Sequence, residues 1–137
     1  MPYLKPLPTI TEENRPFWEA LKRHEFLVPR CKDCGHYNWS PMPACRDCLS
    51  EKQEWVKVSG QGTLFTFSTV YRGPGAFGLE VPYTVAVAEL KEHPRPMLVM
   101  SNLINCKPED IRIGMPVKIV YEDIPGEDMT LWRWAPA

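Results

Sequence analysis

Four of the five cysteines stand in two pairs whose spacing is typical of a metal site. Cys31 and Cys34 form one Cys-x-x-Cys pair, Cys45 and Cys48 form the other, and ten residues separate the pairs. Each pair folds into a turn that aims two thiolates at one point, and two such turns complete a tetrahedral zinc site with bonds of about 2.3 Å. Because all four ligands then come from the protein, we expect a structural zinc ion whose binding energy contributes to folding.

Other uses of these cysteines fit the sequence less well. Disulfides need an oxidising compartment, and the first residues lack the apolar core of a signal peptide. A redox Cys-x-x-Cys pair is normally single and lies at the start of a helix. Iron is the chemically permitted substitute for zinc. His36 follows the first pair and is a further candidate ligand, but four thiolates already satisfy the ion, so we expect it to be solvated.

The remaining nucleophiles and bases do not form a catalytic pattern. Cys106 follows the apolar run 98–104 without an adjacent base, so we expect a small buried hydrophobic residue. The histidines His24, His36 and His93 each lie beside predicted turns or termini. Neither a serine elbow nor a paired-carboxylate motif is present. We therefore predict no catalytic residues, and no turnover from the isolated chain.

Short strands must position the metal-binding turns. The 15 prolines make up about 11% of the chain, roughly twice the usual share of 5%, and they exclude long helices almost everywhere. We expect the cysteine turns to lie in a ribbon that is entered by a strand at 26–29 and left by a strand at 55–58. The segment 1–10 should be an extended arm that is either frayed or laid on a partner.

One helix is predicted, before the ribbon. Asn14 is a credible N-cap, and Pro16 falls in the first turn, where its missing N–H costs nothing. A start at Thr11 is an alternative, but Pro16 would then remove a hydrogen bond from inside the helix. The helix carries an apolar stripe made of Phe17, Trp18 and Leu21.

The second half of the chain has the alternating pattern of strands. Five runs qualify, and they cover residues 63–71, 83–90, 97–104, 117–121 and 130–134. A short turn at 108–111 separates the third run from the fourth. Five strands with such a turn fit a partly open Greek-key barrel of the OB type, whereas an immunoglobulin-like sandwich needs about seven strands.

The predicted fold is therefore mostly β, with an N-terminal helix, a rubredoxin-like zinc ribbon and a five-stranded OB-fold barrel. We place an arm and amphipathic helix in residues 1–25, the zinc ribbon in residues 26–55 and the barrel in residues 56–137.

Taken together, these motifs resemble a known family of zinc-ribbon and OB-fold proteins associated with acyl-CoA enzymes. The resemblance covers nearly the whole chain. It rests on the helix at 17–21, the four ribbon cysteines, and the segments 58–63, 82–90 and 111–117. Members of that family are small accessory subunits of thiolase-fold enzymes, namely thiolases, sterol side-chain aldolases and archaeal hydroxymethylglutaryl-CoA synthesis complexes. The enzyme subunit carries the catalytic residues.

The resemblance implies a noncatalytic zinc subunit of a thiolase or retro-aldolase. Such a subunit would stabilise its partner and help to form a channel for coenzyme A, with the acyl-CoA thioester as a shared ligand. The resemblance further implies a heterotetramer built on a dimer of the partner, and degradation of an aromatic, steroid or fatty acyl-CoA.

Candidate ligand-binding residues lie in the link between the first two barrel strands. Arg72 stands beside a glycine-rich segment, and glycines let backbone N–H groups approach a phosphate. We name Arg72, Gly75 and Phe77 as candidate contacts to coenzyme A or another ligand. The alternative is a flexible hairpin connection with one solvated arginine.

Candidate interface residues lie on the helix and near the C-terminus. Trp132 and Trp134 alternate with Arg133, so both indoles lie on one face of the last strand. Aromatic and arginine side chains often anchor interfaces, but packing inside the barrel is an equally good interpretation. The predicted interface comprises Phe17, Trp18, Trp132, Arg133 and Trp134.

The charge pattern argues against two other classes of partner. The net charge is −1, and four thiolates with one zinc ion would change it to −3. Neither half of the chain is basic, since residues 1–55 carry eight Lys and Arg against eight Asp and Glu, and the remainder carries eight against nine. We therefore predict no nucleic-acid partner, although nucleic-acid binding by a ribbon and OB barrel remains the alternative function.

The longest apolar run is well short of the roughly 18 residues of a membrane span, so we expect no membrane contact and a cytoplasmic location.

Overall fold

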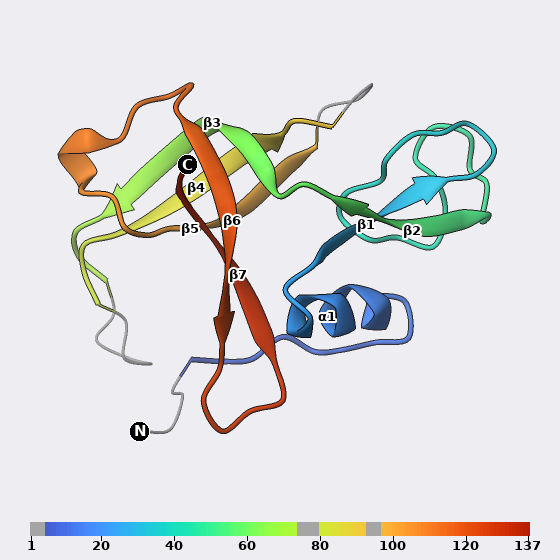
Figure 1. Cartoon of the computed structure of the whole chain (residues 1–137), viewed down its shortest axis with the longest axis horizontal. Helices are drawn as coiled ribbons and strands as arrows, with labels where there is room; N and C mark the ends of the chain where they lie inside the picture. Colours follow the sequence, from blue (N-terminus) through green and yellow to red (C-terminus); the bar gives the residue numbers. More distant parts are fainter. Residues whose placement is uncertain (1–4, 74–79, 93–96) are drawn as a thin grey trace.

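A computed structural model of the chain describes residues 5–73, 80–92 and 97–137. One helix precedes a two-stranded ribbon, and five further strands form a barrel (Figure 1). The elements are α1 (Arg15–Lys22), β1 (Phe26–Cys31), β2 (Gln53–Val58), β3 (Gln61–Val70), β4 (Tyr83–Leu90), β5 (Leu98–Leu103), the 3₁₀ turn η1 (Pro108–Asp110), β6 (Pro116–Asp123) and β7 (Thr130–Pro136). The mostly β fold predicted from the sequence is confirmed.

Helix α1 begins where the prolines allow it. Asn14 is the N-cap residue and Pro16 lies in the first turn, as predicted. The Asn14 side chain does not cap the helix but accepts a hydrogen bond from the backbone N–H of Thr11, at 2.7 Å. Residues 12–14 form a turn, which the Arg15 N–H closes by donating to the Thr11 carbonyl at 2.9 Å. The alternative start at Thr11 is therefore not adopted.

The described part of the N-terminal arm lies on the chain's own surface. Ile10 packs against the hydrophobic core, and Pro8 lines a groove beside β7. In Figure 1 the arm runs past the lower ends of β6 and β7 before it reaches α1. Part of the segment 5–10 therefore packs against other residues of this chain. The sequence alone suggested only a frayed arm or an arm laid on a partner.

The ribbon strands β1 and β2 pair in an antiparallel register that runs from Phe26 opposite Val58 to Cys31 opposite Gln53. This register places the first cysteine at the end of the ribbon that is remote from the barrel. Figure 1 shows β1, β2 and their connecting loops extending to one side of the barrel. The strands therefore present the cysteine turns away from the barrel core.

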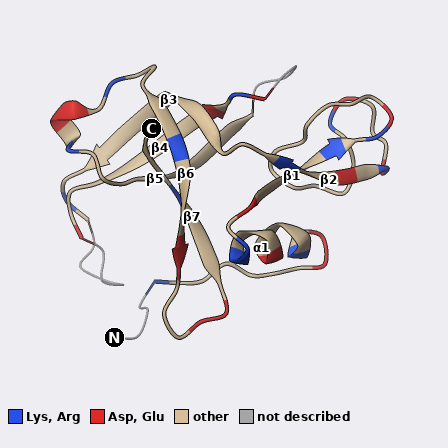
Figure 2. Cartoon of the chain, viewed as in Figure 1, with Lys and Arg blue, Asp and Glu red and all other residues tan. Residues whose placement is uncertain are grey.

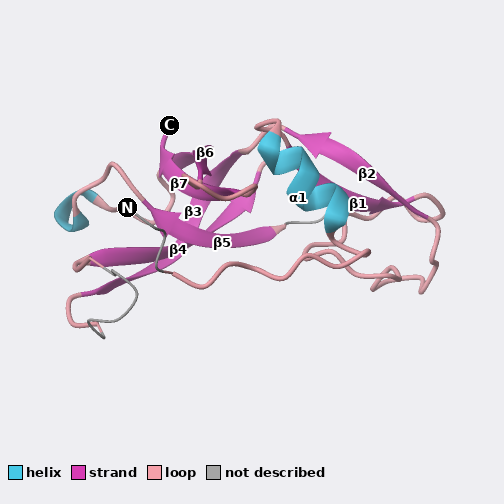
Figure 3. Cartoon of the chain, turned by 90° about the horizontal axis from the view of Figure 1, so that it is seen from below, coloured by secondary structure: helices cyan, strands magenta, loops and turns pink. Residues whose placement is uncertain are grey.

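The barrel closes in the strand order β3-β4-β5-β7-β6. All neighbouring strands are antiparallel except β5 and β7, which pair in parallel at Leu103 and Trp134. The turn η1 lies between the third and fourth barrel strands, as the OB-type prediction requires. Viewed from below, β5 crosses in front of the barrel with α1 beside it (Figure 3). Because β5 and β7 share only this short pairing, their remaining lengths leave room for a groove.

Trp134 occupies the centre of the barrel. Its side chain is fully buried, and its Nε1–H donates to the Val99 carbonyl at 3.0 Å. Burying an indole is favourable when its N–H finds an acceptor in this way.

A second part of the core is aromatic and joins the helix, the ribbon and the barrel. Ring centroids in this cluster lie between 5.1 and 6.2 Å apart, mostly in edge-to-face arrangements. Its members are Phe17, Trp18, Phe26, Trp39 and Trp132. The three parts of the chain therefore share one continuous hydrophobic core.

Candidate metal centre and partner surface

The four predicted ligand sulfurs come together in the ribbon. All four Sγ atoms lie within 4.8 Å of one another. The Cys31 and Cys48 sulfurs are 3.5 Å apart, as are those of Cys34 and Cys45. A tetrahedral zinc ion with bonds of about 2.3 Å needs sulfurs about 3.8 Å apart. All four cysteines are free of disulfides, so the donor set and its spacing fit zinc.

Two equivalent turns position these sulfurs. The Cys31 N–H donates to the His36 carbonyl at 2.8 Å, and the Cys45 N–H donates to the Ser50 carbonyl at the same distance. The fourth residue after each first cysteine closes the turn in a left-handed conformation. It is a glycine in the first turn (Gly35, φ +79°) and a leucine in the second (Leu49, φ +62°).

Backbone N–H groups prepare the first cysteine of each pair to act as a thiolate. Those of Cys48 and Asp47 lower the pKa of Cys45 to about 6, against the opposing effect of burial. The N–H of Cys34 likewise lowers the pKa of Cys31 below its usual value. These hydrogen bonds favour the thiolate form that a metal ligand needs at Cys31 and Cys45. At Cys34 and Cys48, the backbone N–H groups are outweighed by burial and the neighbouring cysteine sulfurs, which raise the pKa, so these two thiols would lose their protons as the metal binds.

His36 lies at the edge of the cysteine cluster. Its Nδ1 is 3.4 Å from the Cys34 sulfur and also contacts the Asp47 carboxylate. Over the part of the chain that the structure describes, the cluster suited to a metal consists of the four cysteines alone. His36 thus neighbours a ligand, and its ring is partly buried rather than fully solvated.

The residues predicted to form an interface divide into two groups. Phe17, Trp18 and Trp134 are buried, with exposed fractions of 2%, 8% and 0%, so their side chains chiefly stabilise this chain's own fold. Trp132 and Arg133 are only partly buried.

A groove of about 290 Å³ runs between β5 and β7. Trp132 and Arg133 line it together with Trp18, so three of the predicted interface residues meet there. Met100 adds an apolar wall from β5 and is 59% exposed. The sequence signal for this wall was the unbroken apolar run 98–100, because consecutive apolar residues in a strand face both sides of the sheet.

The predicted ligand-binding residues are not brought to a site by the described structure. Arg72 is exposed two residues after β3. Gly75 and Phe77 lie outside the described residues. A role for this link in binding coenzyme A therefore remains a prediction.

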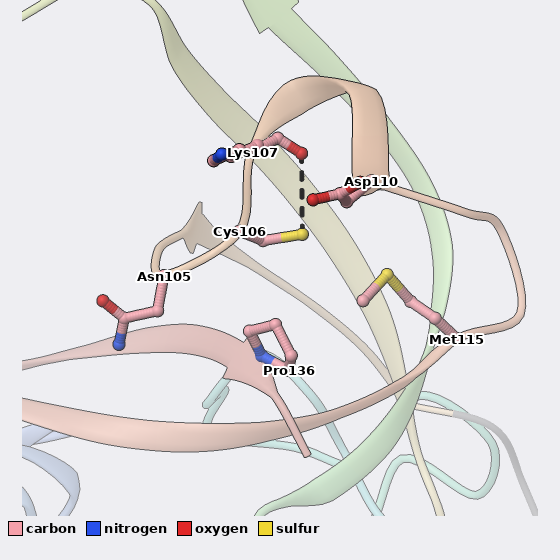
Figure 4. A pocket seen from close by; sticks show the side chains of 6 residues that line it. All are labelled: Asn105, Cys106, Lys107, Asp110, Met115 and Pro136. Atoms are coloured by element: carbon pink, nitrogen blue, oxygen red, sulfur yellow. Dashed lines mark hydrogen bonds between the residues drawn. The ribbon is translucent and has the colours of Figure 1, made fainter.

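Cys106 is less buried than we expected. Its side chain is partly exposed and lines a cavity of about 680 Å³ beside η1, together with Asp110, Met115 and Pro136 (Figure 4). Its Sγ–H donates weakly to the Lys107 carbonyl at 3.7 Å. Its partial burial raises the pKa of this thiol, which disfavours the thiolate form. Cys106 nevertheless packs against the hydrophobic core, so the expectation of a small buried hydrophobic residue is met in part.

Comparison with known proteins identifies the family. The family model described as "ChsH2, rubredoxin-like zinc ribbon domain" matches residues 18–54, and the model described as "ChsH2, C-terminal OB-fold domain" matches residues 55–122. A DUF35 domain-containing scaffold protein of Methanocaldococcus jannaschii is 35% identical over 109 residues, which are 78% of this chain and 75% of that protein. The chain belongs to the DUF35 family. The predicted zinc ribbon and OB-fold barrel are thereby confirmed.

Two other relatives of this DUF35 chain are named as enzyme subunits. The 3-oxo-4,17-pregnadiene-20-carboxyl-CoA hydratase alpha subunit of Mycobacterium tuberculosis is 34% identical over 94% of this chain and 39% of that subunit. The benzoylsuccinyl-CoA thiolase subunit BbsA of Geobacter metallireducens is 30% identical over 70% of this chain and 66% of that subunit. This chain thus spans about two fifths of the hydratase subunit and about two thirds of the thiolase subunit.

Among solved structures, one chain of the Ltp2-ChsH2(DUF35) aldolase superposes closely on this DUF35 protein. The TM-score is 0.84 at 29% identity, and the match covers 95% of this chain and 98% of the other. The likeness therefore includes the helix, the ribbon and the barrel in one arrangement.

Proposed function

We propose that this protein is a noncatalytic, zinc-containing subunit of a thiolase-like acyl-CoA enzyme. The observation that carries the proposal is the end-to-end match to the DUF35 chain of the Ltp2-ChsH2(DUF35) aldolase. The names of two relatives, a thiolase subunit and a hydratase subunit, also refer to CoA compounds. A thiolase or retro-aldolase subunit is the partner that these similarities favour.

The described histidines support a noncatalytic role. His24 pairs with the Asp123 carboxylate at 3.1 Å and stacks on the Tyr121 ring. His36 borders a metal ligand. Within the described ranges, neither histidine has a serine or a non-ligand cysteine among its hydrogen-bond partners. General-base activation of a nucleophile needs such a contact, so we place the chemistry in the partner.

Exposed apolar side chains on the barrel support the proposal that a partner protein covers this part of the surface. Phe65, Leu98 and Met100 are 52%, 43% and 59% exposed. Met100 lies opposite Val87 in the strand register, so it borders an apolar residue of β4. A surface of this kind beside an aromatic groove is typical of protein interfaces. We propose that the partner covers the groove between β5 and β7, and that two copies of each subunit form a heterotetramer.

The ligand would be shared between the subunits. We propose that the link after β3, which begins at Arg72, helps to form the partner's channel for coenzyme A. An aromatic, steroid or fatty acyl-CoA is the substrate class that we favour. Replacing Arg72 by Ala in the assembled complex should raise the apparent KM for the acyl-CoA with little change in kcat. An unchanged KM would argue against this role.

Nucleic-acid binding is the second candidate function, because OB barrels bind oligonucleotides through charged grooves and stacking aromatics. Among the described residues, positively and negatively charged residues are interspersed along the ribbon and the barrel (Figure 2). A titration with a fluorescent oligonucleotide at physiological salt separates the two functions. Binding at micromolar concentration would favour nucleic acid, and its absence would favour the subunit role.

The subunit role is tested first by association. The protein should co-purify at fixed stoichiometry with a thiolase-fold protein encoded beside it when the two are expressed together. A chain that elutes alone in the presence of that neighbour would contradict the proposal.

A further inference from the structure

Asn38 is a buried polar residue between the two cysteine pairs. Only 2% of its surface is exposed, although asparagine is usually found at the surface. A buried amide is tolerated when its donors and acceptors are paired. The partners of Asn38 therefore indicate what the residue holds in place.

The Asn38 side chain bridges the two halves of the metal centre. Its Oδ1 accepts a hydrogen bond from the backbone N–H of Arg46 at 3.2 Å, directly after the ligand Cys45. Its Nδ2 donates to Gln53 Oε1 at 3.0 Å. Gln53 is paired with Cys31 in the ribbon register, and its own Nε2 donates to the Met42 carbonyl at 2.8 Å.

The turn that Asn38 contacts is also the strained one. The left-handed position is Gly35 in the first turn but Leu49 in the second, and left-handed backbone is unfavourable for residues with a Cβ. The Leu49 side chain is 77% exposed, so it gains little packing in return. The second turn therefore needs support from elsewhere in the ribbon.

We propose that Asn38, held by Gln53, is a positioning residue of the metal centre that keeps the Cys45 turn in the geometry zinc requires. This role depends on the zinc ribbon alone and not on the proposed subunit function. Residues that orient metal ligands commonly change metal affinity about 10- to 100-fold when they are replaced.

The first test is zinc affinity, measured by competition with a chromophoric chelator. Asn38→Ala should bind zinc about 10- to 100-fold more weakly than the native protein. Thr84→Val is the matched control, because Thr84 is also a buried polar residue whose hydroxyl is bonded, but in the barrel. It should leave zinc affinity unchanged. Equal affinity of the native and Asn38→Ala proteins would overturn the proposal.

The second test distinguishes positioning from general loosening of the ribbon. Each cysteine of the zinc-loaded protein is alkylated, and its rate is followed by peptide mass spectrometry. In Asn38→Ala we expect Cys45 and Cys48 to react faster, with a smaller change at Cys31 and Cys34. Equal acceleration of all four thiols would show a merely structural role and contradict the proposal.

Two more variants keep the test decisive if Asn38→Ala fails to take up metal. Gln53→Met removes the hydrogen bond from Asn38 to Gln53 but leaves Asn38 bonded to the Arg46 N–H. This variant should therefore weaken zinc binding less than Asn38→Ala does. Its alkylation should again be faster at Cys45 and Cys48 than at Cys31 and Cys34. Leu49→Gly should tighten zinc binding by about fivefold and partly restore the Asn38→Ala protein, because glycine relieves the left-handed strain. Native affinity in Gln53→Met, or no gain in Leu49→Gly, would overturn the proposal.

Discussion

The two cysteines of each pair have different surroundings. Cys31 and Cys45 are 1% and 0% exposed, whereas Cys34 and Cys48 lie at the surface. All four sulfurs accept backbone N–H groups, and the two exposed ones complete the cluster from the solvent side. The sequence spacing was sufficient to predict that these four sulfurs come together, because a Cys-x-x-Cys turn is a local structure. It did not predict Asn38, whose partners are separated from it by 8 and 15 residues.

Replacing a ligand cysteine should remove both the metal and the ribbon. Cys31→Ser leaves three thiolates, so the protein should lose its one equivalent of zinc and the ribbon should unfold, because structural zinc supplies apparent binding energy of about 10–16 kcal/mol. Zinc content by plasma mass spectrometry and near-ultraviolet circular dichroism of the tryptophans measure the two effects. Cys106→Ser is the matched control and should keep its zinc. One full equivalent of zinc in Cys31→Ser would refute the four-cysteine site.

At the scale of elements, local patterns predicted the helix and the strands well. The strand 83–90 was predicted with the bounds that β4 has. Strand β3 begins two residues earlier than predicted, because Gln61 and Gly62 pair with β6. The aromatic cluster could not be predicted, because it brings together α1, β1, the following loop and β7, which are distant in sequence. Sequence periodicity shows which face of an element is apolar, but not which other element covers it.

An ion pair that joins α1 to the β6–β7 loop should make stability depend on pH in the alkaline range. Lys22 Nζ lies 2.8 Å from Asp128 and 3.2 Å from Glu19, and these two carboxylates raise the pKa of Lys22. A raised pKa stabilises the fold below the ordinary value of 10.5, and the contribution is lost as the pH rises through the higher folded value. Lys22→Gln should thus lower the denaturant midpoint at pH 8 but not at strongly alkaline pH. A difference that is constant across this range would contradict the prediction.

For the whole molecule, the cysteine ribbon and the shared aromatic core have separate roles. The zinc ribbon extends to one side, and the aromatic cluster fixes α1 and β1 against the barrel. The same arrangement places Trp18, Trp132 and Met100 around one groove. The proposed docking surface depends on both the helix and the barrel, so we expect it to form only when the two are packed together.

Association with the partner should be weakened most by a charge that is introduced in the groove. Met100→Glu places a carboxylate on its apolar wall, so association with the thiolase-fold partner should weaken by about tenfold or more. The thermal midpoint of the isolated chain should stay the same, because Met100 is largely exposed. Ile113→Glu is the matched control, since Ile113 is 68% exposed and lies outside the groove. Equal affinities of the two variants, measured by calorimetry, would place the interface elsewhere.

The central claim is that this chain has no turnover of its own but is required by its partner. The direct test compares steady-state cleavage of an acyl-CoA by the thiolase-fold partner alone, by this chain alone and by the reconstituted complex. We predict no turnover from this chain, little from the partner, and full activity with saturation by coenzyme A only in the complex. A partner that is stable, fully active and saturable by coenzyme A without this chain would contradict the claim.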